Sequence, residues 1–302
     1  MAILTEQFRE IESRLKFPAD AVWVFDALAA RLDAGKYGAR FEKIRRAYLN
    51  GKCGWGRTVK KTEALAKQMK VRQETLDFVL CIKCFETAHK RYRRAGLPDE
   101  IYWQSADDLR CKLLECIECE HVPGTFVAGW FGDFFTLRRF AVGRFQYEFT
   151  DDPADYVTPG GVKVKGGQVL RIHIPSSGVP LTDEVRLDSY RRAWEFFPQF
   201  RTKDGLLMFI CDSWLLYPAH RKFLPKNSNI LRFMDDFTIV RESTEQHFHN
   251  DWRLFGHWTE YPLAEWPEDT SLRRAYKKWL MDGNLAGSGS GVIVFDGKKI
   301  VR

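Results

Sequence analysis

The chain has 302 residues, of which 45% are apolar, and a formal net charge of +7. No stretch approaches the roughly 20 consecutive apolar residues that cross a bilayer, so the sequence excludes a protein with membrane-spanning helices. Seven cysteines are an odd number, and a chain with this much apolar content needs no disulfide framework; with no signal-like start, we expect reduced thiols in the cytoplasm.

The first 120 or so residues predict a succession of helices. Apolar residues recur at helical spacing from Leu4 to Leu15, and the pattern returns twice before residue 51. Two more helices follow, a short one over Thr62–Met69 and a long one over Gln73–Arg94. Ser105, with Asp108 three residues later, predicts a capping box for a helix that runs to about Glu120.

The pattern changes after Pro123-Gly124, where strands and helices begin to alternate. Two strands are expected to pair as a long-looped hairpin, and the apolar strand that follows is of the buried type. These strands are Phe145–Phe149, Val169–Ile174 and Leu206–Trp214; shorter candidates are Thr238–Arg241, Arg253–Phe255 and Val292–Phe295, and the expected helices are Glu184–Phe197 and Ser271–Met281. We therefore expect an α+β protein, with a helical domain over 1–125 and a mixed α/β sheet domain over 126–302.

Several local motifs together resemble a known family. They are Trp130, Gly143-Arg144-Phe145-Gln146-Tyr147-Glu148, His173-Ile174-Pro175 with Gly178, Phe209 to Leu216, Leu224 to Ile230, and Thr270 to Ala275 before a glycine-rich stretch. Over nearly the whole chain, the sequence resembles bacterial N-acyltransferases with a helical N-terminal domain and a GNAT-like C-terminal domain. The resemblance implies direct transfer of an acyl group from a thioester donor, either acyl-CoA or an acyl carrier protein, to a small-molecule or peptide amine, without a metal. It implies no oligomeric state.

One turn of the sheet domain is a candidate for binding the donor. Ser176, Ser177 and Gly178 lie between a predicted strand and a predicted helix. A small-residue turn in that position can offer backbone N–H groups to a phosphate. We expect it to receive the pyrophosphate or pantetheine of the donor, and an ordinary connection is the alternative. The Gln/Arg-x-x-Gly-x-Gly/Ala turn that GNAT proteins use for this purpose is absent, because Gly287 to Gly291 leads into a strand.

The resemblance also implies that two neighbouring strands splay apart, with the thioester between them. The transfer needs a base for the amine proton and an acid for the leaving thiolate. His173 or Asp212 is the candidate base, and Ser213 or Cys211 is expected near the thioester. Cys211 as a covalent nucleophile with His173 as its base is an alternative, and so are purely structural roles for these residues.

Two further patterns suggest other functions. Cys81-x-x-Cys84 and Cys116-x-x-Cys119 have the spacing of zinc ligands, but both pairs lie within predicted helices, where they can pack inward. The segment from Leu65 through the helix after Val71 resembles a helix-turn-helix with lysines nearby, as in DNA-binding proteins. The alternative to an acyltransferase is therefore a non-catalytic, GNAT-like regulatory or nucleic-acid-binding protein, although nucleic acid is the less expected partner.

Overall fold

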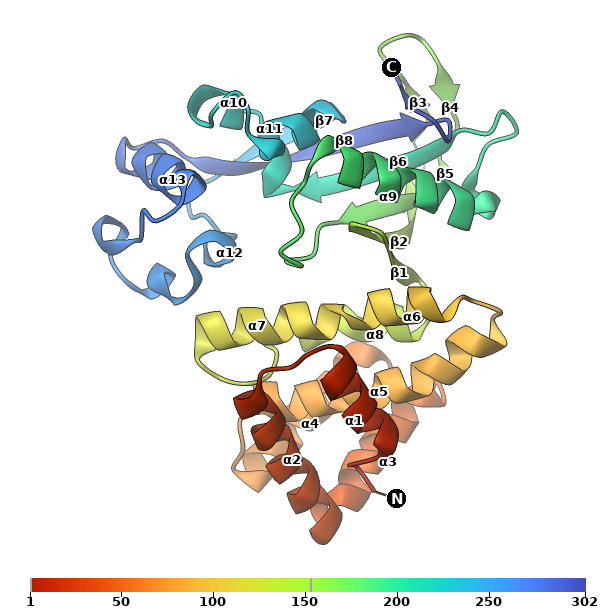
Figure 1. Ribbon diagram of the computed structural model, residues 1–302, viewed down its shortest axis with the longest axis vertical. Helices are drawn as coiled ribbons and strands as arrows, with labels where there is room; N and C mark the ends of the chain where they lie inside the picture. The colour runs from red at the N-terminus through yellow and green to blue at the C-terminus, as the bar shows by residue number, and fades with distance from the viewer. Residues whose placement is uncertain (1, 153) are drawn as a thin grey trace. The chain divides into compact units, whose positions relative to one another are not determined.

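The computed structural model describes residues 2–152 and 154–302, which form two compact units (Figure 1). The first ends at Phe140 and the second begins at Ala141, whereas we expected the boundary near residue 125. The segment between these positions carries Phe131, Phe134 and Phe135, all fully buried. Their rings pack around Phe85 of the helical unit, with centroid distances of 5.0 to 6.1 Å. This aromatic packing extends the first unit.

The first unit is built around one long helix, α5 (Gln73–Arg94). Helix α5 contacts α1, α2, α3, α4, α6, α7 and α8. The other elements are α1 (Glu6–Arg14), α2 (Ala19–Ala34), α3 (Tyr37–Leu49), α4 (Trp55–Met69), α6 (Asp99–Ala106), α7 (Asp108–Glu120), η1 (Ala128–Phe131) and α8 (Gly132–Phe135). The helices that we predicted over residues 4–94 are thus present, with α4 starting earlier than expected.

The central position of α5 bears on the helix-turn-helix hypothesis. Every residue from Thr75 to Glu86 is buried. A recognition helix must present a face of side chains to the major groove, and α5 buries all faces of this stretch against its own unit. The geometry therefore does not favour the DNA-binding alternative.

The predicted capping box at Ser105 is wrong. Ser105 lies inside α6 and is fully buried, and α7 follows after the single residue Asp107. The Asp108 carboxylate accepts a hydrogen bond from the indole Nε1 of Trp130, at 2.7 Å. Tertiary packing of α6 and of Trp130 thus decides the role of both predicted capping residues.

A buried carboxylate in α1 makes the stability of the protein depend on pH. Glu12 is 3% exposed, one of its oxygens has no hydrogen-bond partner among the described residues, and the other accepts from Arg9 at 3.1 Å. Burial, with the nearby Asp26 charge, raises the pKa of Glu12 to about 7. In an unfolded chain the pKa of Glu is about 4.3, so the folded state holds the proton more tightly. The free energy of unfolding therefore falls as pH rises through this window.

We accordingly expect Glu12→Gln to have a higher Tm than the unsubstituted protein at pH 8, with the difference shrinking as pH approaches 5. Thermal denaturation across this pH range measures it. Glu10→Gln is the matched control, since the Glu10 side chain is 51% exposed. A Tm difference that is constant from pH 5 to pH 8 would contradict the assignment.

The second unit contains one mixed sheet. Among the described residues, seven strands form it, in the order β1-β2-β5-β6-β8-β7 with β9 also paired to β8. The strands are β1 (Arg139–Val142), β2 (Phe145–Asp152), β5 (Gly167–His173), β6 (Leu207–Ser213), β7 (Thr238–Glu245), β8 (Ala286–Phe295) and β9 (Ile300–Val301). β2 and β5 pair antiparallel, as predicted for the long hairpin, and their connection carries the small hairpin of β3 (Tyr156–Val157) and β4 (Lys163–Val164). The α+β fold with a helical first part is confirmed.

The two faces of the sheet differ in chemistry. Helix α9 (Asp183–Phe196) lies across one face (Figure 1), where its Tyr190 packs on Phe145 and Phe209. On the opposite face, an apolar cluster at one end of the strands packs against the β3–β4 hairpin through Val164 and Tyr156. The other end of that face is polar. The remaining helical elements of the unit are η2 (Pro198–Phe200), η3 (Trp214–Leu216), α10 (His220–Phe223), α11 (Asn229–Asp235), α12 (Trp252–Phe255), η4 (Gly256–Glu260), η5 (Leu263–Glu265) and α13 (Ser271–Met281).

Strand β8 is longer than predicted because it includes the glycine-rich stretch. Gly287, Gly289 and Gly291 lie on one face, where an added Cβ would meet atoms of Tyr217, Leu216 and Phe237 at less than 3 Å. The glycines therefore let the segment after β6 pack directly on the sheet. The short strand predicted at Arg253–Phe255 is wrong: these residues belong to α12, whose Leu254 and Phe255 are buried. Three residues are too few to distinguish a helical period from a strand period.

None of the helices in the described residues is long and apolar enough to cross a membrane.

Candidate active site

Strands β5 and β6 separate at one end of the sheet. In the described part of the chain, their parallel pairing comprises two positions, Leu170 with Phe209 and Arg171 with Ile210. The other edge of β6 pairs with β8 over its full length, from Leu207 to Ser213. Beyond Arg171 and Ile210 the described residues of β5 and β6 are no longer paired, and we refer to these unpaired strand ends as the splay. The family resemblance implied that two neighbouring strands separate with the thioester between them, and the end of this ladder is where such a separation would begin.

His173 lies at the open end of β5 on the polar face of the sheet. Its Nε2 is 2.8 Å from Oε2 of Glu148 on β2, and both side chains are about one fifth exposed. The register explains the contact, because Gln146 is paired with His173 and Glu148 with Arg171, and paired residues share a face. A carboxylate is thereby held against one imidazole nitrogen.

The contact with Glu148 favours the tautomer of the imidazole that carries its hydrogen on Nε2. With Nε2 donating its hydrogen to the carboxylate, the neutral ring carries its lone pair on Nδ1. The carboxylate also stabilises the imidazolium that forms when Nδ1 takes a proton. His173 and Glu148 therefore have the geometry of an oriented general base.

Asp212 lies on β6 on the same face as His173, two residues beyond Ile210. Its side chain is 44% exposed, and Oδ1 accepts a hydrogen bond from the Ser290 hydroxyl at 2.5 Å. The guanidinium groups of Arg171 and Arg241 each lie 3.8 Å from its carboxylate. The structure thus places His173 and Asp212 on the two sides of the splay, with Arg171 at the point where the strands part.

Cys211 and Ser213 lie on the other face of β6, away from His173. Cys211 is 1% exposed, and burial raises the pKa of its thiol well above the ordinary value. A thiol in this setting is an inert packing group, because the nucleophile is the thiolate. The Ser213 hydroxyl oxygen accepts a hydrogen bond from Leu215 N at 3.1 Å, so it caps η3. The structure does not bring Cys211 and His173 together as a nucleophile and its base.

We therefore expect Cys211→Ala to keep the rate of the acyl transfer that the family resemblance implies within about twofold per folded molecule. The loss of a small buried group costs stability of roughly 1 kcal/mol. Steady-state kinetics beside thermal denaturation would check both values. A loss of activity of a hundredfold or more in a folded variant, or a covalent acyl adduct on Cys211, would restore the nucleophile hypothesis.

The turn after β5 is held by Arg144, which lies between β1 and β2. Arg144 Nε donates to the carbonyl of Val179 at 2.9 Å, and its Nη1 donates to the carbonyl of Pro175 at 3.0 Å. Between these carbonyls lie Ser176, Ser177 and Gly178, with Gly178 in the left-handed region at φ +80°. The start of α9 is already capped by Thr182 and carries Asp183 and Glu184 in its first turn, which disfavours an anion there. Any phosphate contact of this segment therefore falls on the turn itself, next to Arg144.

Three residues of the site were given no role from the sequence: Glu148, Arg171 and Arg144. Arg144 and Glu148 stood only within a motif that carries the family resemblance. Glu148 and Arg171 come together only through the β2–β5 register, and a long, irregular connection between two strands leaves the register open. Arg144 reaches across 31 and 35 residues to its carbonyl partners. The alternation of Arg171 and His173 along one strand was the available signal.

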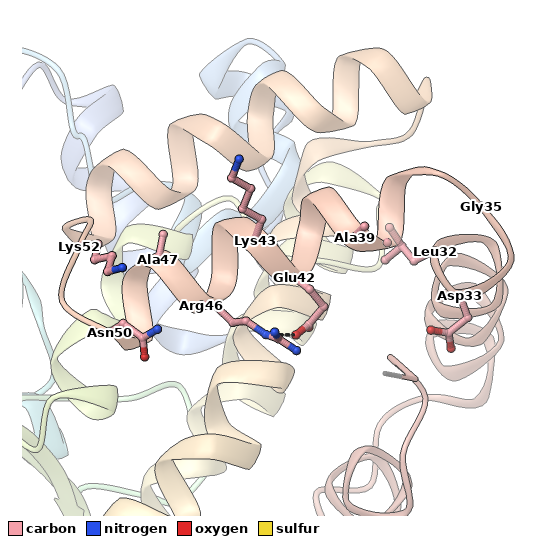
Figure 2. A pocket seen from close by; sticks show the side chains of 11 residues that line it. Leu32, Asp33, Gly35, Ala39, Glu42, Lys43, Arg46, Ala47, Asn50 and Lys52 are labelled. Atoms are coloured by element: carbon pink, nitrogen blue, oxygen red, sulfur yellow. Dashed lines mark ion pairs between the residues drawn. The ribbon is translucent and has the colours of Figure 1, made fainter.

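The other candidate sites lie in the first unit. The zinc hypothesis fails on geometry: Cys81 and Cys84 are buried in α5, where burial raises the pKa of both thiols. The described residues contain no group of three or more metal-ligating side chains. A groove of about 630 Å³ lies between the end of α2 and helix α3 (Figure 2), and its rim carries Lys43, Arg46 and Lys52. Arg46 is paired there with Glu42 at 3.5 Å, and the groove contains none of the predicted site residues.

Comparisons with known proteins agree with this architecture. The sequence matches none of the curated proteins. The chain is similar in fold to solved structures described as an acyltransferase in complex with decanoyl-CoA and teicoplanin (TM-score 0.71, 18% identity, 95% of this chain and 87% of that chain covered) and with CoA and 10C-teicoplanin (TM-score 0.71, 18% identity, 97% and 88% covered). A third, an acyltransferase in complex with decanoyl-CoA, has a TM-score of 0.60 and 19% identity, with 94% and 98% covered.

Two family matches cover nearly all of the sequence. Residues 6–137 match the family described as N-acyltransferase N-terminal domain. Residues 140–293, just over half of the chain, match the family described as GNAT-like C-terminal domain. The chain therefore belongs to the family of proteins in which an N-acyltransferase N-terminal domain precedes a GNAT-like C-terminal domain.

Proposed function

We propose that this protein is an N-acyltransferase that moves an acyl group from acyl-CoA to an amine. The observation that carries the proposal is the splay of β5 and β6, with His173 at its open end. A thioester inserted between the strand ends would lie within reach of an amine held on the polar face. An acyl carrier protein thioester is the same chemistry with a larger donor.

The donor fits the α9 side of the splay. The turn of Ser176, Ser177 and Gly178, held by the cationic Arg144, would receive the pyrophosphate. The pantetheine would then run along the open edge of β5. Backbone groups at the ends of two separated strands can hydrogen-bond to its amides, because these groups are not used in the ladder.

The transfer itself requires two proton movements. His173 takes a proton from the amine on Nδ1, and Glu148 stabilises the resulting imidazolium. The nitrogen attacks the thioester carbonyl, a tetrahedral intermediate forms, and the carbon–sulfur bond breaks to release the thiolate. The Ser213 hydroxyl accepts from Leu215 N and so keeps its own hydrogen available, which suits it to donate a hydrogen bond to the leaving thiolate. The thiolate leaves with the negative charge, and the His173 imidazolium then releases its proton to solvent. Asp212 would attract the amine in its ammonium form, which releases one proton to solvent before His173 takes the second during attack.

We also propose that the protein acts in the cytoplasm. None of the cysteines forms a disulfide in the described part of the chain, which suits a reducing compartment. The acceptor would be a small molecule or a peptide with an accessible amine, a class that includes the glycopeptide named for the similar structures.

A panel of acyl-CoA chain lengths tests the proposal. We expect a saturable increase in Tm with at least one of them, and an N-acylated product with a mixture of amines, detected by mass spectrometry. The same assay with acylated carrier protein separates the two donor types. Absence of binding and of product with both donors would sink the acyltransferase proposal and leave a non-catalytic module.

A further inference from the structure

Arg171 is an arginine with unused hydrogen-bond donors at the point where the strands part. Its side chain is 37% exposed, its buried Nε has no partner among the described residues, and its one ion pair is at 3.8 Å, to Asp212. Arg186 in the same unit is an arginine whose donors are used: its guanidinium donates hydrogen bonds to both carboxylate oxygens of Asp236, at 2.6 and 3.2 Å. A half-buried guanidinium with unsatisfied donors favours an anionic ligand.

The charges around Arg171 point in the same direction. Arg171 and Arg241 both lie 3.8 Å from the single carboxylate of Asp212. One oxygen of that carboxylate already accepts from Ser290. Glu148, the pairing partner of Arg171 on β2, adds a second carboxylate to this face, but its Oε2 is 2.8 Å from Nε2 of His173. Both neighbouring carboxylates therefore have partners other than Arg171, and a carboxylate on the ligand would give this guanidinium its own. The planar fork of a guanidinium matches a carboxylate in a two-bond geometry.

The position of Arg171 relative to His173 limits where such a carboxylate sits on the ligand. Residues two apart on a strand point to the same face, with Cα atoms about 7 Å apart. An amine near His173 Nδ1 and a carboxylate on Arg171 can therefore belong to one small molecule. We propose that the acceptor is an amine that carries a carboxylate within a few bonds of the nitrogen, as in an amino acid, and that Arg171 binds this carboxylate. This inference rests on the proposed N-acyltransferase function.

The test compares two product analogues that differ only in the carboxylate: N-octanoylphenylalanine and N-octanoylphenethylamine. Calorimetric titration of each into the full-length protein with CoA measures binding without requiring turnover. We expect the carboxylate analogue to bind about 10–100-fold more tightly. This preference should collapse in Arg171→Gln and be partly restored in Arg171→Lys. Arg191→Gln, an exposed arginine on α9, should keep it.

A second readout is the ratio of kcat/KM for phenylalanine over phenethylamine with octanoyl-CoA, in which the loss in Arg171→Gln should appear in KM. Equal binding of the two analogues, or no binding of the carboxylate analogue, overturns the inference. The acyl-CoA thermal shift of each variant shows that the variant is folded. If no acyl-CoA raises the Tm of the unsubstituted protein, the result counts against the proposed acyltransferase function and not against the role of Arg171. The two failures are therefore distinguishable.

Discussion

Replacement of His173 by Ala is expected to lower kcat for acyl transfer by roughly 10²–10⁴-fold, the usual contribution of a general base. The structure gives the reason: His173 lies at the open end of the splay, and its Nε2 is fixed 2.8 Å from Glu148. Removal of the imidazole leaves no oriented group to take the amine proton. Steady-state kinetics with one acyl-CoA and one amine, after circular dichroism has shown that the variant is folded, measures the effect.

Two further variants make this result specific. Glu148→Gln keeps the shape but removes the negative charge beside Nε2, so we expect a smaller loss of kcat with little change in the KM for acyl-CoA. His247→Ala is the matched control, because His247 is exposed in the loop after β7. A folded His173→Ala enzyme with more than a tenth of the original kcat would show that His173 is a structural group.

Gly289→Ala should be the most damaging small substitution in the sheet. A Cβ at this position would be 2.2 Å from the carbonyl oxygen of Leu216 and 2.8 Å from the carbonyl carbon of the same residue. These are backbone atoms, so relief requires a shift of η3 or of β8. Overpacking of this kind costs about 2–3 kcal/mol, which corresponds to a fall in Tm of roughly 5–10 °C. Differential scanning calorimetry would measure it.

Gly56→Ala provides the control for this substitution. Gly56 lies in the first turn of α4 with nothing within 4 Å of an added Cβ, and alanine is the better helix former by up to about 1 kcal/mol. We expect its Tm to be unchanged or raised. Because β8 pairs with β6 along the splay, Gly289→Ala should also weaken acyl-CoA binding. An unaltered Tm would mean that η3 does not pack on β8 as described.

The local pattern of residues predicted most of the secondary structure. Long helices such as α5 and the amphipathic α13 have enough turns for their period to be read, and the β2–β5 hairpin has clear strands at both ends. The wrong predictions concern segments that are short or whose structure depends on tertiary packing. Ser105 resembles a cap but is enclosed by α6 and α7, and the segment of α12 is too short to show a period.

The same distinction applies to the site. His173, Asp212 and Ser213 were candidates because the family resemblance implies a thioester between two neighbouring strands, and these polar residues lie near the ends of two predicted strands. Which of them act together was open at that stage. The alternation along β6 already separated Cys211 and Ser213 from Asp212, yet the orientation of β6 relative to β5 was needed to show that Asp212, and not Cys211, shares a face with His173.

The sequence by itself determined the order of helices and strands, the family resemblance and the position of the candidate base, because each of these depends on residues close together in the chain. Only the tertiary structure decided the boundary at residue 140, the contact of Glu148 with His173, the unsatisfied donors of Arg171 and the two-position pairing of β5 with β6. Strand register and the end of a ladder are set by long-range packing, which no local pattern encodes.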